Sequence, residues 1–158
     1  MITAIRPISS RWWITSGDWA NRLAVLQEEA TMQISHIALY VHDLEGMKEF
    51  YMRHFAAKAN SQYHNPRTGL RTYFLSFEDG ARLELMHWPD VAPSKPEPRR
   101  AGYGHLAFRV GSREKVDALS AQLSAAGCPV LSGPRVTGDG YYEVSLTDPE
   151  GNSLELVA

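Results

Sequence analysis

The feature that most constrains the fold of this chain is an internal duplication of its sequence. Residues 103–110 (YGHLAFRV) repeat the pattern of residues 34–41 (ISHIALYV), and residues 150–156 (EGNSLEL) repeat that of residues 79–85 (DGARLEL). Each copy therefore opens with a segment that carries a histidine and closes with one that carries a glutamate. A repeat of this kind predicts two copies of one structural unit, with corresponding residues at corresponding places.

Hydrophobic periodicity predicts the elements of the first unit, residues 33–88. Alternating character predicts a strand over residues 34–41, and Asp43 is the residue type expected at the N-cap of the helix that follows. Apolar side chains recur at helical spacing on this helix, at Met47, Phe50, Tyr51 and Phe55. Two strands joined by a tight turn close the unit, at residues 71–77 and 81–87. With a short extended segment near residues 60–64, the order is βαβββ.

The second unit, residues 102–158, follows the same plan. A strand over residues 103–110 precedes a helix that begins after Ser112 and ends at Gly127. The remaining strands are expected near residues 128–132, 140–147 and 153–157. The sequence therefore predicts an α+β fold made of paired βαβββ modules.

The segments outside the two modules differ from them in composition. Residues 89–101 hold four of the nine prolines of the chain, which predicts an extended and semi-rigid linker. Residues 1–32 belong to neither copy, and we interpret them as an N-terminal arm. Because two modules of one chain leave open sheet edges and a half-exposed cavity, we expect a homodimer.

Composition excludes several classes of function. The net charge is -2, and the chain has no run of Lys or Arg that could follow a phosphate backbone, so we expect no nucleic-acid partner. No apolar stretch approaches the roughly 20 residues that a membrane span needs, and we expect no membrane association. The N-terminus has no continuous apolar segment of signal-peptide length, so the expected location is cytoplasmic.

Four side chains in matched positions of the two copies share one face of the predicted sheets. In each strand the apolar residues occupy one face, and the candidate ligands occupy the other, which the helices do not cover. These ligands are His36, Glu84, His105 and Glu155. Two imidazoles and two carboxylates suit a divalent ion, so we expect one ion of nickel, cobalt, manganese or zinc per chain. A curved sheet would hold this ion in a cavity with the ligands on its wall.

The motifs around the second histidine and the last glutamate resemble those of a known family. Residues 102–108 (GYGHLAF) and 147–156 (TDPEGNSLEL) are similar to sequence motifs of glyoxalase I. Over about residues 33–158 the chain resembles the vicinal oxygen chelate superfamily, the group of glyoxalase I, bleomycin-resistance proteins and extradiol dioxygenases. This resemblance implies an eight-stranded open barrel around a metal site, and it implies that the matched histidines and glutamates bind the metal.

The resemblance also implies a function. It indicates a divalent-metal-dependent lyase or isomerase of glyoxalase I type, similar to lactoylglutathione lyase, that acts on a small carbonyl or hydroxy-carbonyl compound. In such chemistry a ligand carboxylate moves a proton between neighbouring carbons. The resemblance assigns the role of base to Glu155 and the role of its counterpart to Glu84.

Two positions depart from the pattern of bacterial glyoxalase I. Those enzymes commonly carry an arginine four residues after the first histidine and an asparagine four residues after the first glutamate, and both help to hold glutathione. This chain has Tyr40 and Trp88 at these positions, so we expect a substrate other than the glutathione hemithioacetal. The candidates for substrate contact are Tyr40, Arg71, Tyr73, Trp88 and Arg109.

Other functions of the same fold stay open at this point. The alternatives among enzymes are a fosfomycin-type transferase, an epimerase of a 2-substituted acyl thioester and a ring-cleaving dioxygenase. A metal-free drug-binding module of the bleomycin-resistance kind is a further alternative. A binding module has no need of four metal ligands, whereas this chain has a complete set.

Overall fold

The computed structural model of the protein describes residues 33–92 and 101–158. Residues 35–158 form one compact unit. The predicted N-terminal arm and most of the predicted proline-rich linker lie outside the described residues. Neither of the described helices is long and apolar enough to cross a membrane.

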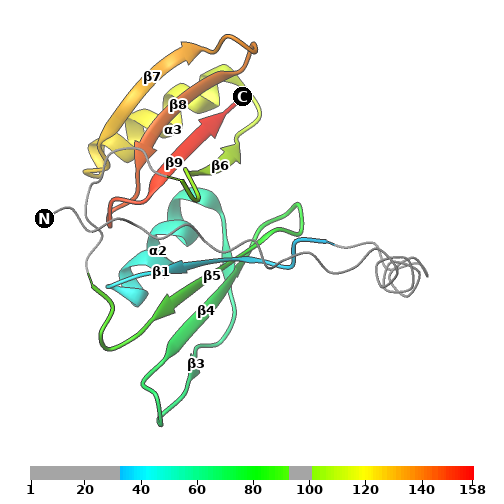
Figure 1. The fold of residues 1–158 in the computed structure, drawn as a ribbon. Helices are drawn as coiled ribbons and strands as arrows, with labels where there is room; N and C mark the ends of the chain where they lie inside the picture. The colour runs from blue at the N-terminus through cyan, green and yellow to red at the C-terminus, as the bar shows by residue number, and fades with distance from the viewer. Residues whose placement is uncertain (1–32, 93–100) are drawn as a thin grey trace, which may run out of the picture. The chain divides into compact units, whose positions relative to one another are not determined.

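The first module has the predicted βαβββ order, with its second strand split into two short pieces. Its elements are β1 (Ile37–Tyr40), α2 (Leu44–Phe55), β2 (Lys58–Ala59), β3 (Tyr63–His64), β4 (Arg71–Ser76) and β5 (Arg82–His87). The sheet has the strand order β1-β5-β4-β2, and β3 also pairs with β4 (Figure 1). Strand β1 runs parallel to β5, and β4 runs antiparallel to it.

The second module repeats this arrangement. Its elements are β6 (Leu106–Arg109), α3 (Arg113–Ala125), β7 (Val130–Val136), β8 (Tyr142–Thr147) and β9 (Ser153–Val157). The strand order is β6-β9-β8-β7, with β6 parallel to β9. The predicted α+β fold of two βαβββ modules is therefore confirmed. Within residues 33–92 and 101–158 the two sheets are not hydrogen-bonded to each other, so these residues do not close a barrel.

Local capping explains where the two helices begin and end. The side chain of Asp43 accepts a hydrogen bond from the backbone nitrogen of Gly46 at 3.0 Å, and Ser112 accepts one from Lys115 at 3.3 Å. Both are N-caps that satisfy an otherwise free amide of the first turn. Helix α2 ends at Phe55, and its C-cap Ala56 has a left-handed backbone with a φ of 53°. The sequence signals for helix starts were therefore sound in both modules.

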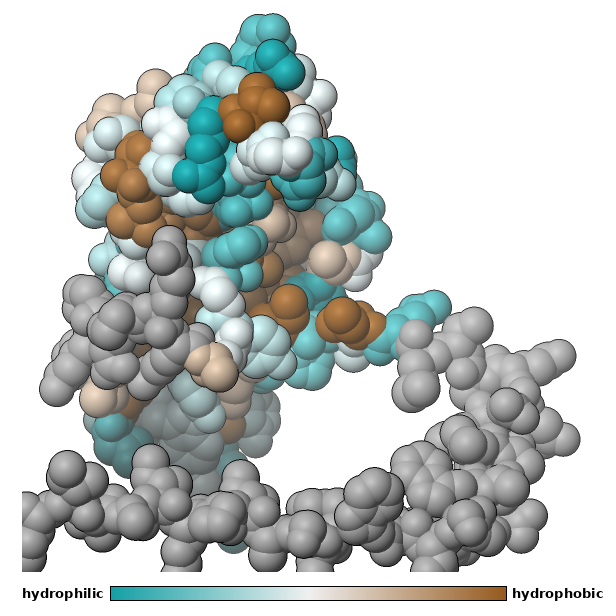
Figure 2. Space-filling model, turned by 45° about the horizontal axis from the view of Figure 1, so that its top comes forward, coloured by the Kyte–Doolittle hydropathy of each residue, from teal (hydrophilic) through white to brown (hydrophobic). Residues whose placement is uncertain are grey.

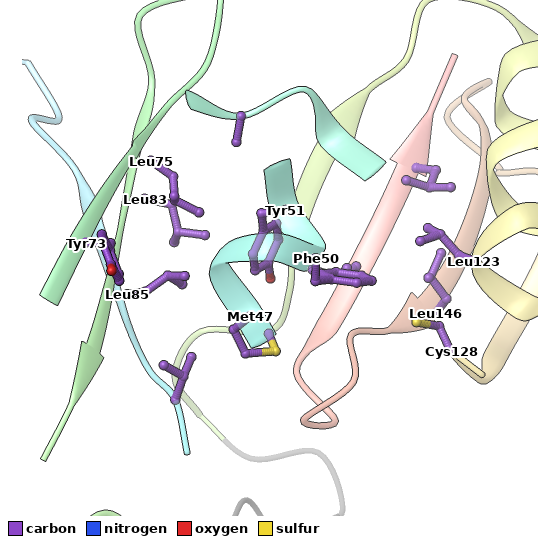
Figure 3. Packing of buried hydrophobic residues seen from close by; sticks show 14 of the residues in the cluster. Met47, Phe50, Tyr51, Tyr73, Leu75, Leu83, Leu85, Leu123, Cys128 and Leu146 are labelled. Atoms are coloured by element: carbon purple, nitrogen blue, oxygen red, sulfur yellow. The ribbon is translucent and has the colours of Figure 1, made fainter. Parts of the chain in front are cut away.

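The apolar faces of the sheets and helices contribute to one hydrophobic core. Figure 3 shows Met47 and Tyr51 of α2 beside side chains of the first sheet such as Leu83. The second module contributes Leu123 of α3 and Leu146 of β8 to the same cluster. Because period-two alternation turns every second side chain away from this core, the polar face of each sheet lies outside it.

The surface carries apolar side chains in several places. The exposed large apolar residues include Ile37, Tyr40, Met52, Tyr63, Tyr103, Val130, Leu131, Val136 and Tyr141. Figure 2 shows several separate apolar areas among polar side chains rather than one continuous patch. Exposed Ile37 and Tyr40 lie on β1, and Val130, Leu131 and Val136 lie on β7, at the ends of the strand orders of the two sheets.

A buried carboxylate joins the turn before β9 to helix α2. Asp148 is 1% exposed and accepts a hydrogen bond from the hydroxyl of Tyr51 at 3.1 Å. It also accepts bonds from the backbone nitrogens of Glu150 and Asn152, each at 2.9 Å, and from the side-chain nitrogen of Asn152 at 2.8 Å. Burial raises the pKa of this carboxyl, while these hydrogen bonds act in the opposite direction.

The same turn holds the start of α2 through a second carboxylate. The side chain of Glu150 accepts hydrogen bonds from the backbone nitrogens of His42, at 2.7 Å, and Asp43, at 2.6 Å. These amides precede α2, where backbone donors have no partner within the helix. The turn that resembles glyoxalase I therefore has a structural role in this chain.

We expect Asp148→Ala to lower the free energy of unfolding by about 3–5 kcal/mol, because it leaves the buried hydroxyl of Tyr51 and three nitrogen donors without their acceptor. Urea unfolding followed by circular dichroism measures this loss. Asp79→Ala is the control, since exposed Asp79 accepts only one local hydrogen bond among the described residues, from Ala81 at 3.0 Å. A loss for Asp148→Ala no larger than that of the control would contradict the structural role of this turn.

Candidate metal centre

The first histidine and the first glutamate of the predicted set lie next to each other. His36 immediately precedes β1, and Glu84 lies on β5, where Ala38 is its partner in the parallel register. The His36 Nε2 atom is 3.5 Å from a carboxylate oxygen of Glu84. This distance exceeds an ordinary hydrogen bond of about 2.9 Å. The Nδ1 atom of His36 lies 3.2 Å from the Ser35 hydroxyl, so the other ring nitrogen faces Glu84.

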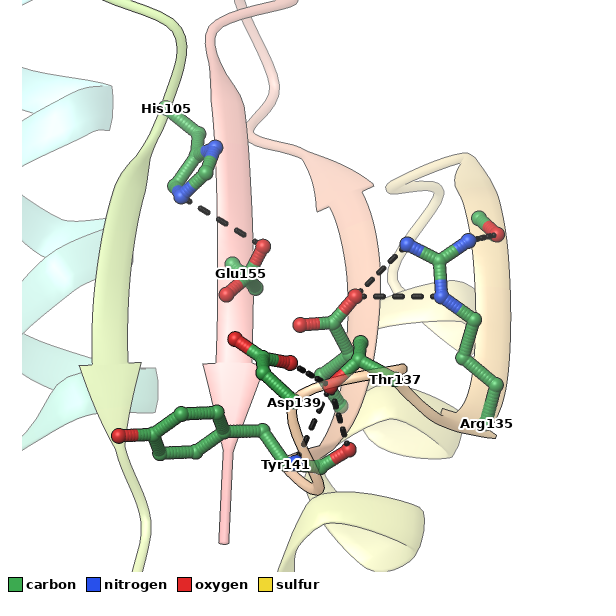
Figure 4. A network of polar contacts seen from close by, with 8 residues as sticks. His105, Arg135, Thr137, Asp139, Tyr141 and Glu155 are labelled. Atoms are coloured by element: carbon green, nitrogen blue, oxygen red, sulfur yellow. Dashed lines mark hydrogen bonds and ion pairs between the residues drawn. The ribbon is translucent and has the colours of Figure 1, made fainter.

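The second histidine and glutamate form an equivalent pair in the second module. His105 immediately precedes β6, and Glu155 lies on β9, where Ala107 is its partner in the parallel register. The His105 Nε2 atom is 3.5 Å from a carboxylate oxygen of Glu155, the same separation as in the first pair (Figure 4). The sequence repeat therefore corresponds to a repeat of side-chain geometry.

The four residues form two separate pairs in the described part of the chain. Within residues 33–92 and 101–158, no three histidine, cysteine, aspartate or glutamate side chains lie close enough to hold one metal ion. The physical reason is the shared core: each pair lies on the face of its sheet that points away from the helix-covered side. Each module thus presents half of the predicted ligand set.

Both pairs fit the ligand chemistry of a divalent transition metal. Each pair offers an imidazole nitrogen and a carboxylate oxygen, and mixed N and O ligands suit nickel, cobalt, manganese and zinc. The side chain of His36 is 37% exposed and that of Glu84 is 15% exposed, while His105 and Glu155 have values of 48% and 17%. In both pairs the histidine is accessible and the carboxylate is largely enclosed.

A second carboxylate accompanies the pair in the second module. Glu143 lies on β8 and is 6% exposed. Its negative charge raises the pKa of Glu155. Burial is the largest cause that raises the pKa of Glu155; His105 opposes this shift and Glu143 adds to it. Arg135 donates to Glu143 at 2.7 Å and 3.2 Å. The sequence analysis did not single out Glu143. This residue lies two positions before Ser145 on β8, so it shares the strand face of Ser145, which is the register partner of Glu155.

An aromatic ring and an arginine accompany the pair in the first module. Phe74 on β4 is the register partner of Glu84, and its ring meets that of His36 edge to face at 5.2 Å. The guanidinium of Arg82 lies over the same ring, 5.2 Å from its centre. Arg82 was not among the predicted site residues, although its place two positions before Glu84 puts it on the same face of β5.

Two of the predicted substrate contacts share a sheet face with one of the His–Glu pairs. Tyr40 on β1 is 59% exposed. It lies on the same strand face as Ala38, which is the register partner of Glu84. Arg109 on β6 has the parity of Ala107, the partner of Glu155, and donates to the backbone oxygen of Ala158 at 3.2 Å. Trp88 follows the end of β5 and is half-buried.

Tyr73 and Arg71 lie on the other face of the first sheet. Their register partners on β5 are Leu85 and His87, which have the opposite parity to Glu84. Tyr73 is 9% exposed, and its hydroxyl donates to Glu45 of α2 at 2.9 Å. The period-two alternation of β4 is the physical reason, because it turns these two side chains toward the helix-covered side. Neither side chain lies on the sheet face of Glu84, the predicted metal ligand on β5.

Comparisons with known proteins identify the family of the chain. Residues 33–156 match the model of the Glyoxalase/Bleomycin resistance protein/Dioxygenase superfamily. The uncharacterized protein YqjT of Bacillus subtilis (strain 168) is 31% identical over 132 residues, which are 78% of this chain and 96% of that protein.

Solved structures show the same fold. A glyoxalase family protein from Enterococcus faecalis has a TM-score of 0.67 and 25% identity, covering 80% of this chain and 97% of that one. The trypanothione-dependent glyoxalase I of Leishmania major has a TM-score of 0.65 and 23% identity, covering 80% and 86% respectively. On the match of its residues 33–156, the chain belongs to the glyoxalase/bleomycin resistance protein/dioxygenase superfamily.

Proposed function

We propose that the protein is a divalent-metal-dependent lyase or isomerase of glyoxalase I type, acting on a small carbonyl or hydroxy-carbonyl compound. The observation that carries this proposal is the equivalence of the two His–Glu pairs, each with a separation of 3.5 Å, on the polar faces of two repeated modules. A quartet preserved in matched positions supports a metal-dependent enzyme over a metal-free binding module.

The site is completed in this proposal by a homodimer. The pair His36–Glu84 of one protomer meets the pair His105–Glu155 of the other, because the described residues of one chain do not bring the two pairs together. A two-fold axis then produces two identical four-ligand sites, since an isologous contact is made twice. Strand β1, at the end of the first sheet, offers apolar surface to such a contact through exposed Ile37 and Tyr40.

The chain supplies the groups that hold the metal and move the proton. When bound, the ion would polarise a carbonyl and stabilise negative charge that develops on its oxygen. Glu155 takes the proton from the hydroxyl-bearing carbon next to the carbonyl and returns it to the carbonyl carbon, while the hydroxyl proton passes to the carbonyl oxygen. Glu84 is its counterpart from the first module, and Phe74 is the register partner of Glu84 on β4.

The substrate differs from the glutathione hemithioacetal in this proposal. Tyr40 shares the face of Glu84 and replaces the expected arginine, and Trp88 replaces the expected asparagine. The related Leishmania enzyme is described as trypanothione-dependent, so a glyoxalase I fold works with another thiol. The candidates for substrate contact that remain are Tyr40, Trp88 and Arg109.

Solvent exchange tests the proposed reaction class whatever the final product is. The protein is loaded with nickel, cobalt, manganese or zinc and mixed in D₂O with hemithioacetals and with small hydroxy-carbonyl compounds. Proton NMR is expected to show loss of the signal of the carbon next to the carbonyl with loaded protein, and retention of that signal after chelation. A protein that retains none of the four ions after dialysis would contradict the proposal.

A further inference from the structure

We propose that Arg82 binds an acidic group of the substrate, so that the substrate is a small hydroxy or keto compound carrying a carboxylate or similar anion beside its metal-binding oxygens. This inference rests on the proposed function, because it places the anion at the same site. The Arg82 proposal specifies that the substrate is negatively charged, a property that the four predicted metal ligands alone do not determine.

The position of Arg82 joins it to the first metal-ligand pair. Arg82 opens β5 two residues before Glu84, and successive side chains of a strand alternate, so both project from the same face. Its guanidinium donates to Ser35, the residue that precedes His36 and also contacts the imidazole of His36. Arg82 therefore contacts the residue that precedes His36 and lies on the same strand face as Glu84.

The guanidinium is held in a fixed orientation. Its Nη2 atom donates to the Ser35 hydroxyl at 2.7 Å, and its Nε atom donates to the Ser35 backbone oxygen at 3.2 Å. It lies over the ring of Phe74, which also forms the edge-to-face pair with His36. An arginine has five N–H donors, so this arrangement leaves donors available for a ligand while the side chain loses little further conformational entropy.

The charge of Arg82 has no carboxylate partner among the described residues. The ion pairs formed by these residues are His36–Glu84, Lys48–Glu45, His105–Glu155 and Arg135–Glu143. Arg135 is the instructive contrast, because it lies in the second module and is already paired with the buried Glu143. Of these two arginines, only Arg135 has a carboxylate partner within residues 33–92 and 101–158, and we infer that the charge of Arg82 is available to a ligand.

Electrostatics indicates which ligand this charge favours. A guanidinium beside a divalent cation is repelled by it, and the repulsion weakens when an anion lies between the two. A ligand with a carboxylate next to its metal-binding oxygens places negative charge between the guanidinium and the metal ion. The planar guanidinium can also hold two carboxylate oxygens at once. A neutral hydroxy-carbonyl compound brings no anion to the guanidinium, which among the described residues donates only to the uncharged Ser35, so the site favours the acid over it.

Two small acids that differ by one carboxylate test this inference. Glycolate has a hydroxyl and one carboxylate, and tartronate has one more carboxylate on the same carbon. Both are titrated by calorimetry into the manganese-loaded full-length protein, its Arg82→Gln and Arg82→Lys variants, and Arg53→Gln. Arg53 is the charge-matched control, because it lies exposed in the last turn of α2, the helix that covers the opposite face of the first sheet.

The expected result is a selective loss. Arg82→Gln lowers the affinity for tartronate by about 10-fold or more, the size expected of a lost charge-assisted contact, and changes that for glycolate by less than about 3-fold. Arg82→Lys keeps the positive charge but lacks the paired N–H donors of the guanidinium, so its loss of tartronate affinity is intermediate. Arg53→Gln matches the wild type. If Arg82→Gln fails to retain manganese, Arg82→Lys carries the comparison.

Two outcomes separate failure of this inference from failure of the proposed function. Equal losses for tartronate and glycolate, or no loss for either, in variants that retain manganese would overturn the role of Arg82 and leave the metal site intact. Wild-type protein that binds no manganese would instead overturn the proposed function. The manganese content of each preparation is therefore measured before the titration.

Discussion

His105→Ala is expected to lower the affinity of the protein for its divalent ion by more than about 100-fold, because loss of a direct ligand exceeds the 10–100-fold effect that is typical of an outer-shell partner. Glu155 would then face the metal without the imidazole that lies 3.5 Å from it. Metal analysis after dialysis, and calorimetric titration of the metal-free protein, measure this loss. His64→Ala is the control, since His64 lies on β3, outside both pairs.

A mixing experiment extends this prediction to the dimer. His36→Ala protein lacks one half-site and His105→Ala protein lacks the other, so neither homodimer has a complete site in our proposal. A mixed dimer combines the intact His36–Glu84 pair of one protomer with the intact His105–Glu155 pair of its partner. Co-expression with two affinity tags isolates this species, and we expect it to bind one ion.

The opposite results are equally clear. A mixed dimer that binds no metal, together with a metal-binding wild-type monomer in light scattering, would show that one chain assembles the site by itself. A His105→Ala variant that binds metal as well as the wild type does would remove the second pair from the ligand set. Both measurements are independent of the identity of the substrate.

Glu155→Gln is expected to lower the rate of proton exchange by about 10²–10⁴-fold, the usual contribution of a positioned general base. The amide oxygen of glutamine can still coordinate a metal, whereas the amide cannot take up a proton at neutral pH. We therefore expect the metal affinity to change much less than the rate. Deuterium exchange under saturating metal gives the rate, and calorimetry gives the metal affinity.

The equivalent substitution in the first module is the matched control. Glu84 lies at the same distance from its histidine as Glu155 does, so Glu84→Gln changes the ligand set in the same way. A smaller loss of exchange rate in Glu84→Gln than in Glu155→Gln would identify Glu155 as the base. Equal losses would mean that the two carboxylates share the role, and a larger loss in Glu84→Gln would assign the base to Glu84.

The sequence by itself determined the fold class, the equivalence of the two modules and the face on which each candidate ligand lies. These properties follow from local rules. Alternation with a period of two places Glu84 opposite Leu83 and Leu85 whatever the rest of the chain does, and an N-cap such as Asp43 acts within one helical turn. The duplication then transfers each assignment from one module to the other.

Only the tertiary structure decided which neighbours surround those ligands and how the two pairs relate. Phe74 and Glu143 come from adjacent strands, and their approach to the pairs depends on register, which the sequence pattern does not specify. The register of β4 with β5 places Tyr73, a predicted substrate contact, beside Leu85 on the helix-covered face. The separation of the two pairs within the described residues also depends on tertiary structure. Both modules pack on one core, and this packing turns their polar faces outward.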